Sequence, residues 1–318
     1  MSADLFNNTG LSERSPCSSG ESCLSSKVKG ELKKITNVSS NDDATILSAT
    51  KEITSCPNLT CSLKTLSKNN STLEESLPGL FAALKPRGPV NSTKLLSNFD
   101  IDAVLSRWAV EFNGFFNCEY SMIDFYRVQN AFATLSIPEI LAGRIGLNLG
   151  PHQQNVRRPA DCFACVLNTD VSSGPGKHWV SVFVDCRPSL GNPWTVEYFN
   201  STGNAPCKDV IRWMEETRES LEAYRRMCCT SGTASDAVHS GIPDSMEGGK
   251  VDPNSIDLRK VISVPVSSVS HQKSDTECGV YSLFFIRKRL VGTPYTFFKD
   301  YKIPDEEMIK FRKFVFRD

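Results

Sequence analysis

The chain has 318 residues, 40% of them hydrophobic, which suffices for one large domain or for one domain with an appendage. Its 36 basic and 36 acidic residues cancel, so no overall basic field favours nucleic acid or anionic lipid as a partner. The first 15 residues lack a signal-peptide core and no apolar run could span a bilayer, so we expect a cytosolic product without a membrane span.

The first 88 residues differ in composition from the rest of the chain. They are rich in Ser, Thr, Asn and Lys, and their short apolar stretches predict small helices. Residues 85–89 contain two prolines and a glycine, which interrupt regular structure. We therefore predict a helical and partly flexible N-terminal arm at 1–88 and a second, larger domain at 89–318.

The larger domain combines strand and helix patterns. A helix capped by Asn98 or Asp100 precedes two β-rich runs, and helices follow them, which predicts the α+β class. The predicted elements, in chain order, are the first helix with Ile101, Val104, Leu105, Trp108 and Ala109 inside, strands 178–185 and 194–200, a helix from Pro206 with Val210, Ile211, Met214 and Leu221 inside, an inserted mobile loop at 228–257, strand 261–266, and helices 278–290 and 306–316.

The 12 cysteines are irregularly spaced along the chain. In the cytosol most of them should be reduced thiols. Cys162 and Cys165 form a Cys-x-x-Cys pair, but no second pair stands at zinc-site spacing. This pattern favours buried or surface thiols over a metal or redox site, and we expect no metal or cofactor.

The two strands at 178–185 and 194–200 predict an antiparallel hairpin centred near Ser189. That register pairs Val182 with Val196 and places His178 opposite Asn200, with their Cβ atoms roughly 5 Å apart. The Asn200 amide oxygen would then hold one imidazole nitrogen and leave the other as a base. Taken alone, both are ordinary polar residues at strand ends. His178, however, is the histidine that has a strand behind it and a partner opposite.

Cys278 stands where a polar turn gives way to an apolar helix. Unpaired N–H groups at a helix N-terminus favour a thiolate and can stabilise an oxyanion. Gln272, six residues earlier, could supply a second, uncharged donor, and Gly279 would let a substrate approach closely. Taken singly, Cys278 is a core thiol and His271–Gln272 a surface turn; the combination with His178 and Asn200 points to a cysteine nucleophile.

The order His178-Trp179, then Asn200 at a strand end, then Gln272-x5-Cys278-Gly279 resembles the Ulp1-like and adenain-like cysteine proteases. Most members carry Asp or Glu where this chain has Asn200, but a viral polyprotein-processing branch uses Asn. The likeness extends over most of residues 89–318. It implies a protease core with a mixed or antiparallel sheet flanked by helices, preceded by a small helical arm.

The resemblance also implies an activity. Cys278 would be the nucleophile, His178 the base, Asn200 its orienter and Gln272 an oxyanion donor. Trp179 would cover a narrow substrate groove near Cys278 that has room only for residues without a Cβ atom. The substrates would be viral core polyproteins, cleaved after Gly-Gly during virion maturation, with other virion core proteins as further partners. The protein would work in the host cytoplasm, at viral factories, and in the virion core.

Three alternatives remain open from the sequence. An isopeptidase could remove ubiquitin-like or SUMO modifiers after Gly-Gly, an acyltransferase would share the thioester chemistry, and a scaffold would use the fold only for binding.

Two further features of the sequence are ambiguous. Gly249-Lys250 could be a self-cleavage site or only a flexible loop. The basic clusters 157–158, 225–226 and 287–289 are expected to be solvated surfaces or polyprotein contacts rather than nucleic-acid sites.

Overall fold

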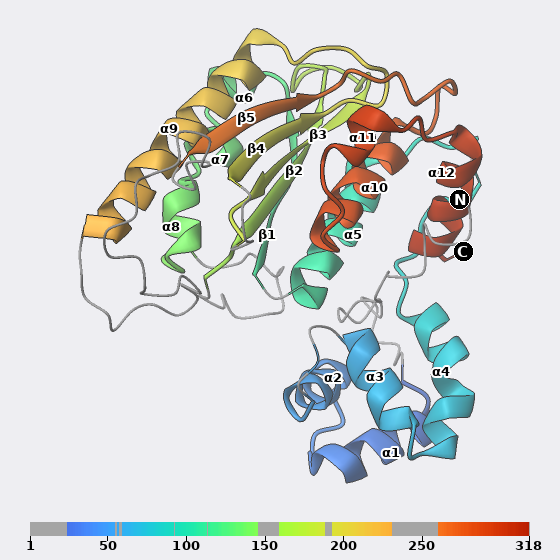
Figure 1. Ribbon diagram of the computed structural model, residues 1–318. Coiled ribbons are helices and arrows are strands. Elements are labelled where there is room, and N and C mark those ends of the chain that lie inside the picture. The colour runs from blue at the N-terminus through green and yellow to red at the C-terminus, as the bar shows by residue number, and fades with distance from the viewer. Residues whose placement is uncertain are drawn as a thin grey trace.

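A computed structural model describes residues 24–317 except 55, 57–58, 92, 113, 146–158, 188–192 and 231–259. A mixed five-stranded sheet lies between two layers of helices, and four N-terminal helices lie beside this core (Figure 1). Among the described residues, no helix is long and apolar enough to cross a membrane. The fold is of the α+β class, as predicted.

The sheet follows the chain in its strand order, β1-β2-β3-β4-β5. The outer pairs β1–β2 and β4–β5 are parallel, whereas β2–β3 and β3–β4 are antiparallel. β2 and most of β3 and β4 are buried on both faces, since helices cover the sheet on each side. The strands are β1 (Phe115–Met122), β2 (Cys162–Asn168), β3 (Trp179–Asp185), β4 (Trp194–Phe199) and β5 (Val261–Val266).

Two hydrophobic clusters lie on opposite faces of the sheet. One contains α5, α10 and α12, and the other contains α7, α8 and α9. Every residue of α10 is buried, which explains the apolar run that predicted this helix. The helices of this core are α5 (Asn98–Glu111), α6 (Phe125–Val128), α7 (Ala131–Thr134), α8 (Ile137–Leu141), α9 (Lys208–Thr230), α10 (Cys278–Leu290), α11 (Phe297–Asp300) and α12 (Asp305–Val315).

The arm has a hydrophobic cluster of its own, drawn from leucines, a valine and an isoleucine between Leu24 and Leu84. Its helices are α1 (Ser26–Thr36), α2 (Asp43–Glu52), α3 (Leu59–Ser67) and α4 (Ser71–Ala83). A disulfide joins Cys56 to Cys61, which the expectation of mostly reduced thiols did not include. Seven described cysteines are free thiols.

Residues at the predicted domain boundary are attached to the C-terminal end of the core. The Gly88 N–H donates to the Arg317 carbonyl (3.0 Å), and the Arg317 N–H donates to the Pro86 carbonyl (2.9 Å). The Lys85 ammonium donates to the Lys313 carbonyl (2.9 Å). The end of the arm and the end of the chain are therefore fixed to each other.

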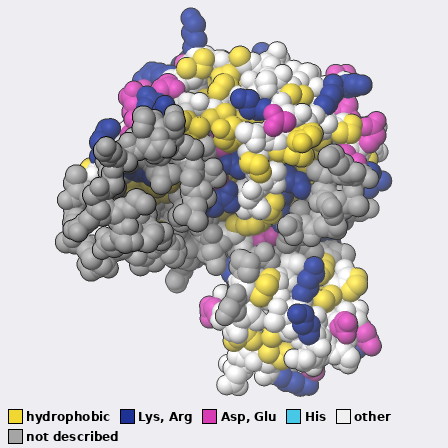
Figure 2. All heavy atoms as spheres, in the orientation of Figure 1, with side chains coloured by type: hydrophobic (Ala, Val, Ile, Leu, Met, Phe, Trp, Pro, Cys, Tyr) yellow, Lys and Arg dark blue, Asp and Glu magenta, His cyan; other side chains and the backbone are white. Residues whose placement is uncertain are grey.

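The basic run Arg287-Lys288-Arg289 is buried, so the expectation that it is a solvated surface is wrong. Arg287 is 0% exposed and donates to Glu111 at 2.7 Å. Arg289 is 5% exposed and bonds both Glu197 and Asp185 at 2.8 Å. Buried charges need such partners, and these pairs attach α10 to α5 and to the sheet. On the described part of the face in Figure 2, other Lys and Arg side chains are scattered among acidic and apolar ones.

The predicted hairpin forms, but its register is wrong by two residues. Val182 pairs with Tyr198, and Val184 with Val196. A two-residue shift leaves every side chain on the same face of the sheet, so the hydrophobic pattern could not distinguish the two registers. The turn at 188–192 lies outside the described residues.

Smaller corrections concern two helices. The cap of α5 is Ser97, which forms a capping box with Asp100. Ile211 on α9 is 48% exposed, although we predicted it inside. α9 continues to Thr230, so the predicted loop at 228–257 begins too early. The rest of that loop, 231–257, with Gly249 and Lys250, lies outside the described residues.

Candidate active site

His178 and Asn200 meet at the same end of two neighbouring strands. His178 directly precedes β3 and Asn200 directly follows β4. In the observed register Asn200 is the diagonal neighbour of His178 rather than its opposite partner, a separation that long side chains still bridge. His178 Nε2 lies 2.9 Å from Asn200 Oδ1, so the predicted contact is present.

The hydrogen bonds around Asn200 determine which imidazole nitrogen carries the proton. Asn200 Nδ2 donates to the Asn204 carbonyl (3.2 Å) and to the Tyr198 hydroxyl (3.1 Å). Asn200 Oδ1 accepts from the Thr202 N–H (3.0 Å), which fixes the orientation of the amide. Because Oδ1 can only accept, His178 Nε2 must be the donor. The lone pair of His178 Nδ1 is therefore left to act as a base.

Cys278 is the first residue of α10 and is 3% exposed. Burial raises the pKa of its thiol, while the nearby backbone N–H groups of Trp179, Gly279 and Cys278 itself favour the thiolate and oppose the rise. Gly279, the residue after Cys278, lies against the indole of Trp179, the residue after His178. The segments that carry Cys278 and His178 therefore lie next to each other.

Trp179 and Gly279 pack closely against each other and against Leu96. The Trp179 indole is 8% exposed, and its Nε1 donates to the Leu96 carbonyl at 3.1 Å. A Cβ atom on Gly279 would lie 3.1 Å from Leu96 Cβ and 3.2 Å from Trp179 Cδ1. Glycine at 279 is thus explained first by the close approach of this indole beside Cys278.

Gln272 is oriented by contacts on both sides of its amide. The Ser201 hydroxyl donates to Gln272 Oε1 at 2.7 Å, and Gln272 Nε2 donates to the Ser274 carbonyl. The backbone N–H of Gln272 also donates to the Ser201 carbonyl (3.0 Å). One of the two N–H bonds of the Gln272 amide is used by Ser274, which leaves the second as a candidate oxyanion donor.

His271 is a core residue, which excludes the alternative of a surface turn at this position. The side chain is 1% exposed and packs against Phe199 and Tyr281. Its Nδ1 accepts the Ile303 N–H at 3.2 Å. Burial lowers the pKa of His271 to about 4, so the ring is neutral at pH 7. His271 fixes the base of the turn that carries Gln272.

The Cys-x-x-Cys pair does not form a site. Cys162 and Cys165 belong to the clusters on opposite faces of the sheet, because they are three residues apart on β2. Burial raises the pKa of both thiols. The prediction of buried thiols is confirmed. In the described ranges, no group of three His, Cys, Asp or Glu side chains could hold a metal.

Comparisons with known proteins identify the family of the chain. The Ulp1 protease family, C-terminal catalytic domain, matches residues 150–318. The SUMO-1 cysteine protease of African swine fever virus (isolate Pig/Kenya/KEN-50/1950) is 36% identical over 300 residues, covering 93% of this chain and 92% of the relative. The chain belongs to the Ulp1 protease family. It is a cysteine protease, hence a hydrolase, and a homologue of these viral enzymes.

A second relative and a solved structure match most of the chain. The cysteine protease of the Tick/Malawi/Lil 20-1/1983 isolate of the same virus is likewise 36% identical over 93% of this chain and 92% of its own length. A crystal structure of an African swine fever virus protease matches with a TM-score of 0.60 and 34% identity, covering 97% of this chain and 96% of that chain. The likeness therefore includes the helical arm.

Sequence reasoning missed one residue that contacts the chain immediately before Cys278. Arg312 on α12 is 0% exposed and bonds Glu277, the residue before Cys278, at 3.1 Å. It also donates to the Thr276 carbonyl (3.2 Å) and to the Pro89 carbonyl (2.9 Å). The Glu277 carboxylate is paired with Arg312 and does not accept a hydrogen bond from the first turn of α10. Nothing in a charged helical sequence signals such a contact.

Proposed function

We propose that this cysteine protease cleaves viral polyproteins after Gly-Gly, with Cys278 as nucleophile, His178 as base and Asn200 as orienter. The observation that carries the proposal is the 2.9 Å bond between His178 and Asn200. It forms next to Trp179, whose indole packs against Gly279, the residue after Cys278. An imidazole held by an amide oxygen beside a thiol is the arrangement that cysteine peptidases require.

The reaction follows from the protonation states. Burial favours the neutral thiol, so His178 Nδ1 takes the proton as Cys278 Sγ attacks the carbonyl carbon of the second Gly. The Cys278 N–H and the second N–H of Gln272 stabilise the tetrahedral oxyanion. His178 returns the proton to the leaving amine, and water then hydrolyses the thioester. Asn200 keeps Nδ1 directed at the sulfur throughout, since Nε2 stays bonded to it.

Selection of glycine is supported by the packing beside Cys278. The Leu96 carbonyl fixes the indole of Trp179, and Tyr120 contacts its ring edge to face, with ring centroids 6.1 Å apart. A fixed indole cannot move aside for a bulky substrate residue. Substrates without a Cβ atom at the two positions before the cleaved bond avoid this clash.

Polyproteins are the proposed substrates because the likeness to the viral enzymes covers the arm as well as the protease core. By the same proposal, the enzyme works in the host cytoplasm and in the virion core. A second candidate is removal of a ubiquitin-like modifier after Gly-Gly. It is favoured by the printed name of one relative, a SUMO-1 cysteine protease.

Two substrate series separate these candidates. The first consists of polyprotein-type peptides with Gly-Gly, Gly-Ala and Ala-Gly before the cleaved bond. The second is a folded SUMO-1 domain fused to a reporter through its C-terminal Gly-Gly. Polyprotein processing predicts cleavage of the Gly-Gly peptide at least about tenfold faster than of either alanine peptide, with the fusion no better than the peptide. Preferred cleavage of the fusion would instead establish deconjugation, and equal cleavage of all peptides would refute Gly-Gly selectivity.

A further inference from the structure

The turn at 271–277 links β5 to Cys278 and carries Gln272. It has no regular secondary structure, so its backbone N–H groups need partners outside it. The N–H of Ser274 donates to the Asp305 carboxylate at 2.8 Å, and the N–H of Lys273 donates to the same carboxylate at 3.2 and 3.3 Å. One side chain from α12 therefore accepts two successive N–H groups of this turn.

Asp305 also contacts the helix on the other side of Cys278. The hydroxyl of Tyr281, one turn into α10, lies 2.9 Å from Asp305 Oδ1 and 2.8 Å from the Ile303 carbonyl. The carboxylate thus connects the chain four residues before Cys278 with the chain three residues after it. Burial, followed by the hydrogen bond to Asp305, raises the pKa of Tyr281, so its hydroxyl keeps the proton that it donates.

A chain of hydrogen bonds runs from Asp305 to the candidate oxyanion donor. The carboxylate holds the Ser274 N–H, and the Ser274 carbonyl accepts from Gln272 Nε2. On the far side the Ser201 hydroxyl fixes Gln272 Oε1. If Ser274 shifts, the Gln272 amide loses one of its two supports and turns away from the oxyanion position.

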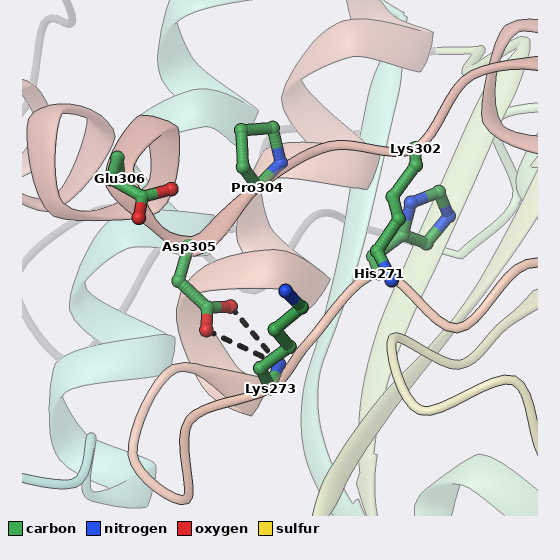
Figure 3. A pocket seen from close by; sticks show the side chains of 6 residues that line it. All are labelled: His271, Lys273, Lys302, Pro304, Asp305 and Glu306. Carbon is green, nitrogen blue, oxygen red and sulfur yellow. Dashed lines mark hydrogen bonds between the residues drawn. The ribbon is translucent and has the colours of Figure 1, made fainter.

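Asp305 and its neighbour Glu306 both line a pocket with a volume of about 330 Å³. In Figure 3 the Asp305 carboxylate points at the backbone of Lys273, whereas Glu306 has no such contact. Within the described part of the chain, no hydrogen bond connects Glu306 to the turn. Glu306 is therefore a matched control for charge and location. The pocket is lined by His271, Lys273, Lys302, Pro304, Asp305 and Glu306.

We propose that Asp305 is a positioning residue for Gln272, acting through the main chain of Lys273 and Ser274. The proposal rests on the proposed function only for the role given to Gln272. Without the carboxylate, the N–H groups of Lys273 and Ser274 must bind water instead. The Gln272 amide then loses its fixed orientation. An oxyanion donor works only when it is already in place as the charge develops.

The test uses the full chain with Asp305→Asn, Asp305→Ala and the control Glu306→Gln. Removal of an oxyanion donor costs roughly 100-fold in kcat or more, and misplacement should cost less. We expect Asp305→Asn to lower kcat by about tenfold, with KM and the melting temperature nearly unchanged, and Asp305→Ala to lower it further. Glu306→Gln should match wild type. Equal kcat for Asp305→Asn and Glu306→Gln would overturn the proposal.

A double-mutant cycle with Gln272→Ala separates positioning from a general structural effect. If Asp305 acts through Gln272, Asp305→Asn should cost less than about twofold in the Gln272→Ala background. A full tenfold loss in that background would show that Asp305 acts elsewhere and would overturn the proposal.

Hydrogen–deuterium exchange tests the turn without any substrate. Peptides covering 272–277 should exchange at least about tenfold faster in Asp305→Asn than in wild type or Glu306→Gln. Unchanged exchange would reject the role of Asp305 whatever the activities show. Failure of the proposed function would appear differently, as a wild-type enzyme with a protected turn that does not cleave the Gly-Gly peptide.

Discussion

Asn200 Oδ1 lies 2.9 Å from His178 Nε2, and the same amide donates through Nδ2 to the Asn204 carbonyl at 3.2 Å. The second contact explains why an amide, rather than the carboxylate usual in this family, suits the site. A carboxylate would direct an oxygen at that carbonyl, and the two acceptors would repel each other.

Asn200→Asp should therefore destabilise the enzyme rather than improve it. The lost bond and the unpaired carbonyl predict a fall of about 1–3 kcal/mol in the free energy of unfolding. Urea denaturation at pH 7 measures this value. The control is Asn204→Asp, which keeps the backbone carbonyl and the Asn200 amide. Unchanged stability of Asn200→Asp would show that the Asn204 contact does not select the amide.

Arg312→Met should be one of the costliest changes away from the reacting atoms. It leaves the Glu277 carboxylate buried and unpaired beside Cys278, which predicts a loss of about 3–5 kcal/mol in the free energy of unfolding. Lys310→Met on the same helix, which breaks a partly exposed pair with Glu307, should cost less than about 1 kcal/mol. Similar losses for the two variants would contradict the role assigned to Arg312.

Gly279→Ala tests the close packing beside the nucleophile. The added methyl lies 3.1–3.2 Å from Leu96 and Trp179, so the indole must move by a few tenths of an ångström. We expect kcat/KM on the Gly-Gly peptide to fall by about tenfold or more, since a small displacement at a reacting site is costly. Gly292→Ala lies in open space but at positive φ, and it should affect stability more than activity. Full activity of Gly279→Ala would refute the tight indole contact.

Asp102 should give the stability an unusual dependence on pH. Burial, with a lesser contribution from Glu119, raises its pKa to about 7, whereas an unfolded chain has a value near 3.8. Between these values the native state binds more protons, so the contribution of Asp102 to stability falls as pH rises from about 4 to about 7.

The comparison with Asp102→Asn isolates this contribution, because the amide does not titrate. On acidification from pH 7 to pH 4, the free energy of unfolding of wild type should rise relative to that of Asp102→Asn. The rise should be at most about 1.4 kcal/mol per pH unit. The exposed Asp209→Asn serves as control and should show no such trend. A pH-independent difference for Asp102→Asn would contradict the buried, protonated carboxyl.

The local sequence pattern was sufficient to predict features that depend on a single helix or on neighbouring strands. The helix at 278–290 was predicted with the bounds that the structure has, because its residues are apolar and a glycine follows. Sequence also brought His178 and Asn200 together despite the wrong register, since a two-residue slip preserves the face and long side chains bridge the diagonal.

Long-range contacts were beyond local pattern. β1 and β2 were not predicted as strands, because their partners are set by the sheet and not by their own sequence. Arg287 and Arg289 are charged residues of a kind usually found at the surface. They are buried because each pairs with a carboxylate more than 90 residues away in the chain, which local sequence cannot reveal. Asp305 resembles an ordinary residue of a helix start. Its bonds to Lys273 and Ser274 follow from the tertiary fold alone.

The central claim is that Cys278 is the nucleophile of a Gly-Gly-directed protease. The most direct test is mass spectrometry of a Gly-Gly-x peptide incubated with wild type, Cys278→Ala and the control Cys207→Ala, which removes an exposed thiol. We predict that wild type and Cys207→Ala release a product ending at the second Gly, while Cys278→Ala folds and releases none. Cleavage by Cys278→Ala, or wild-type cleavage at another bond, would contradict the claim.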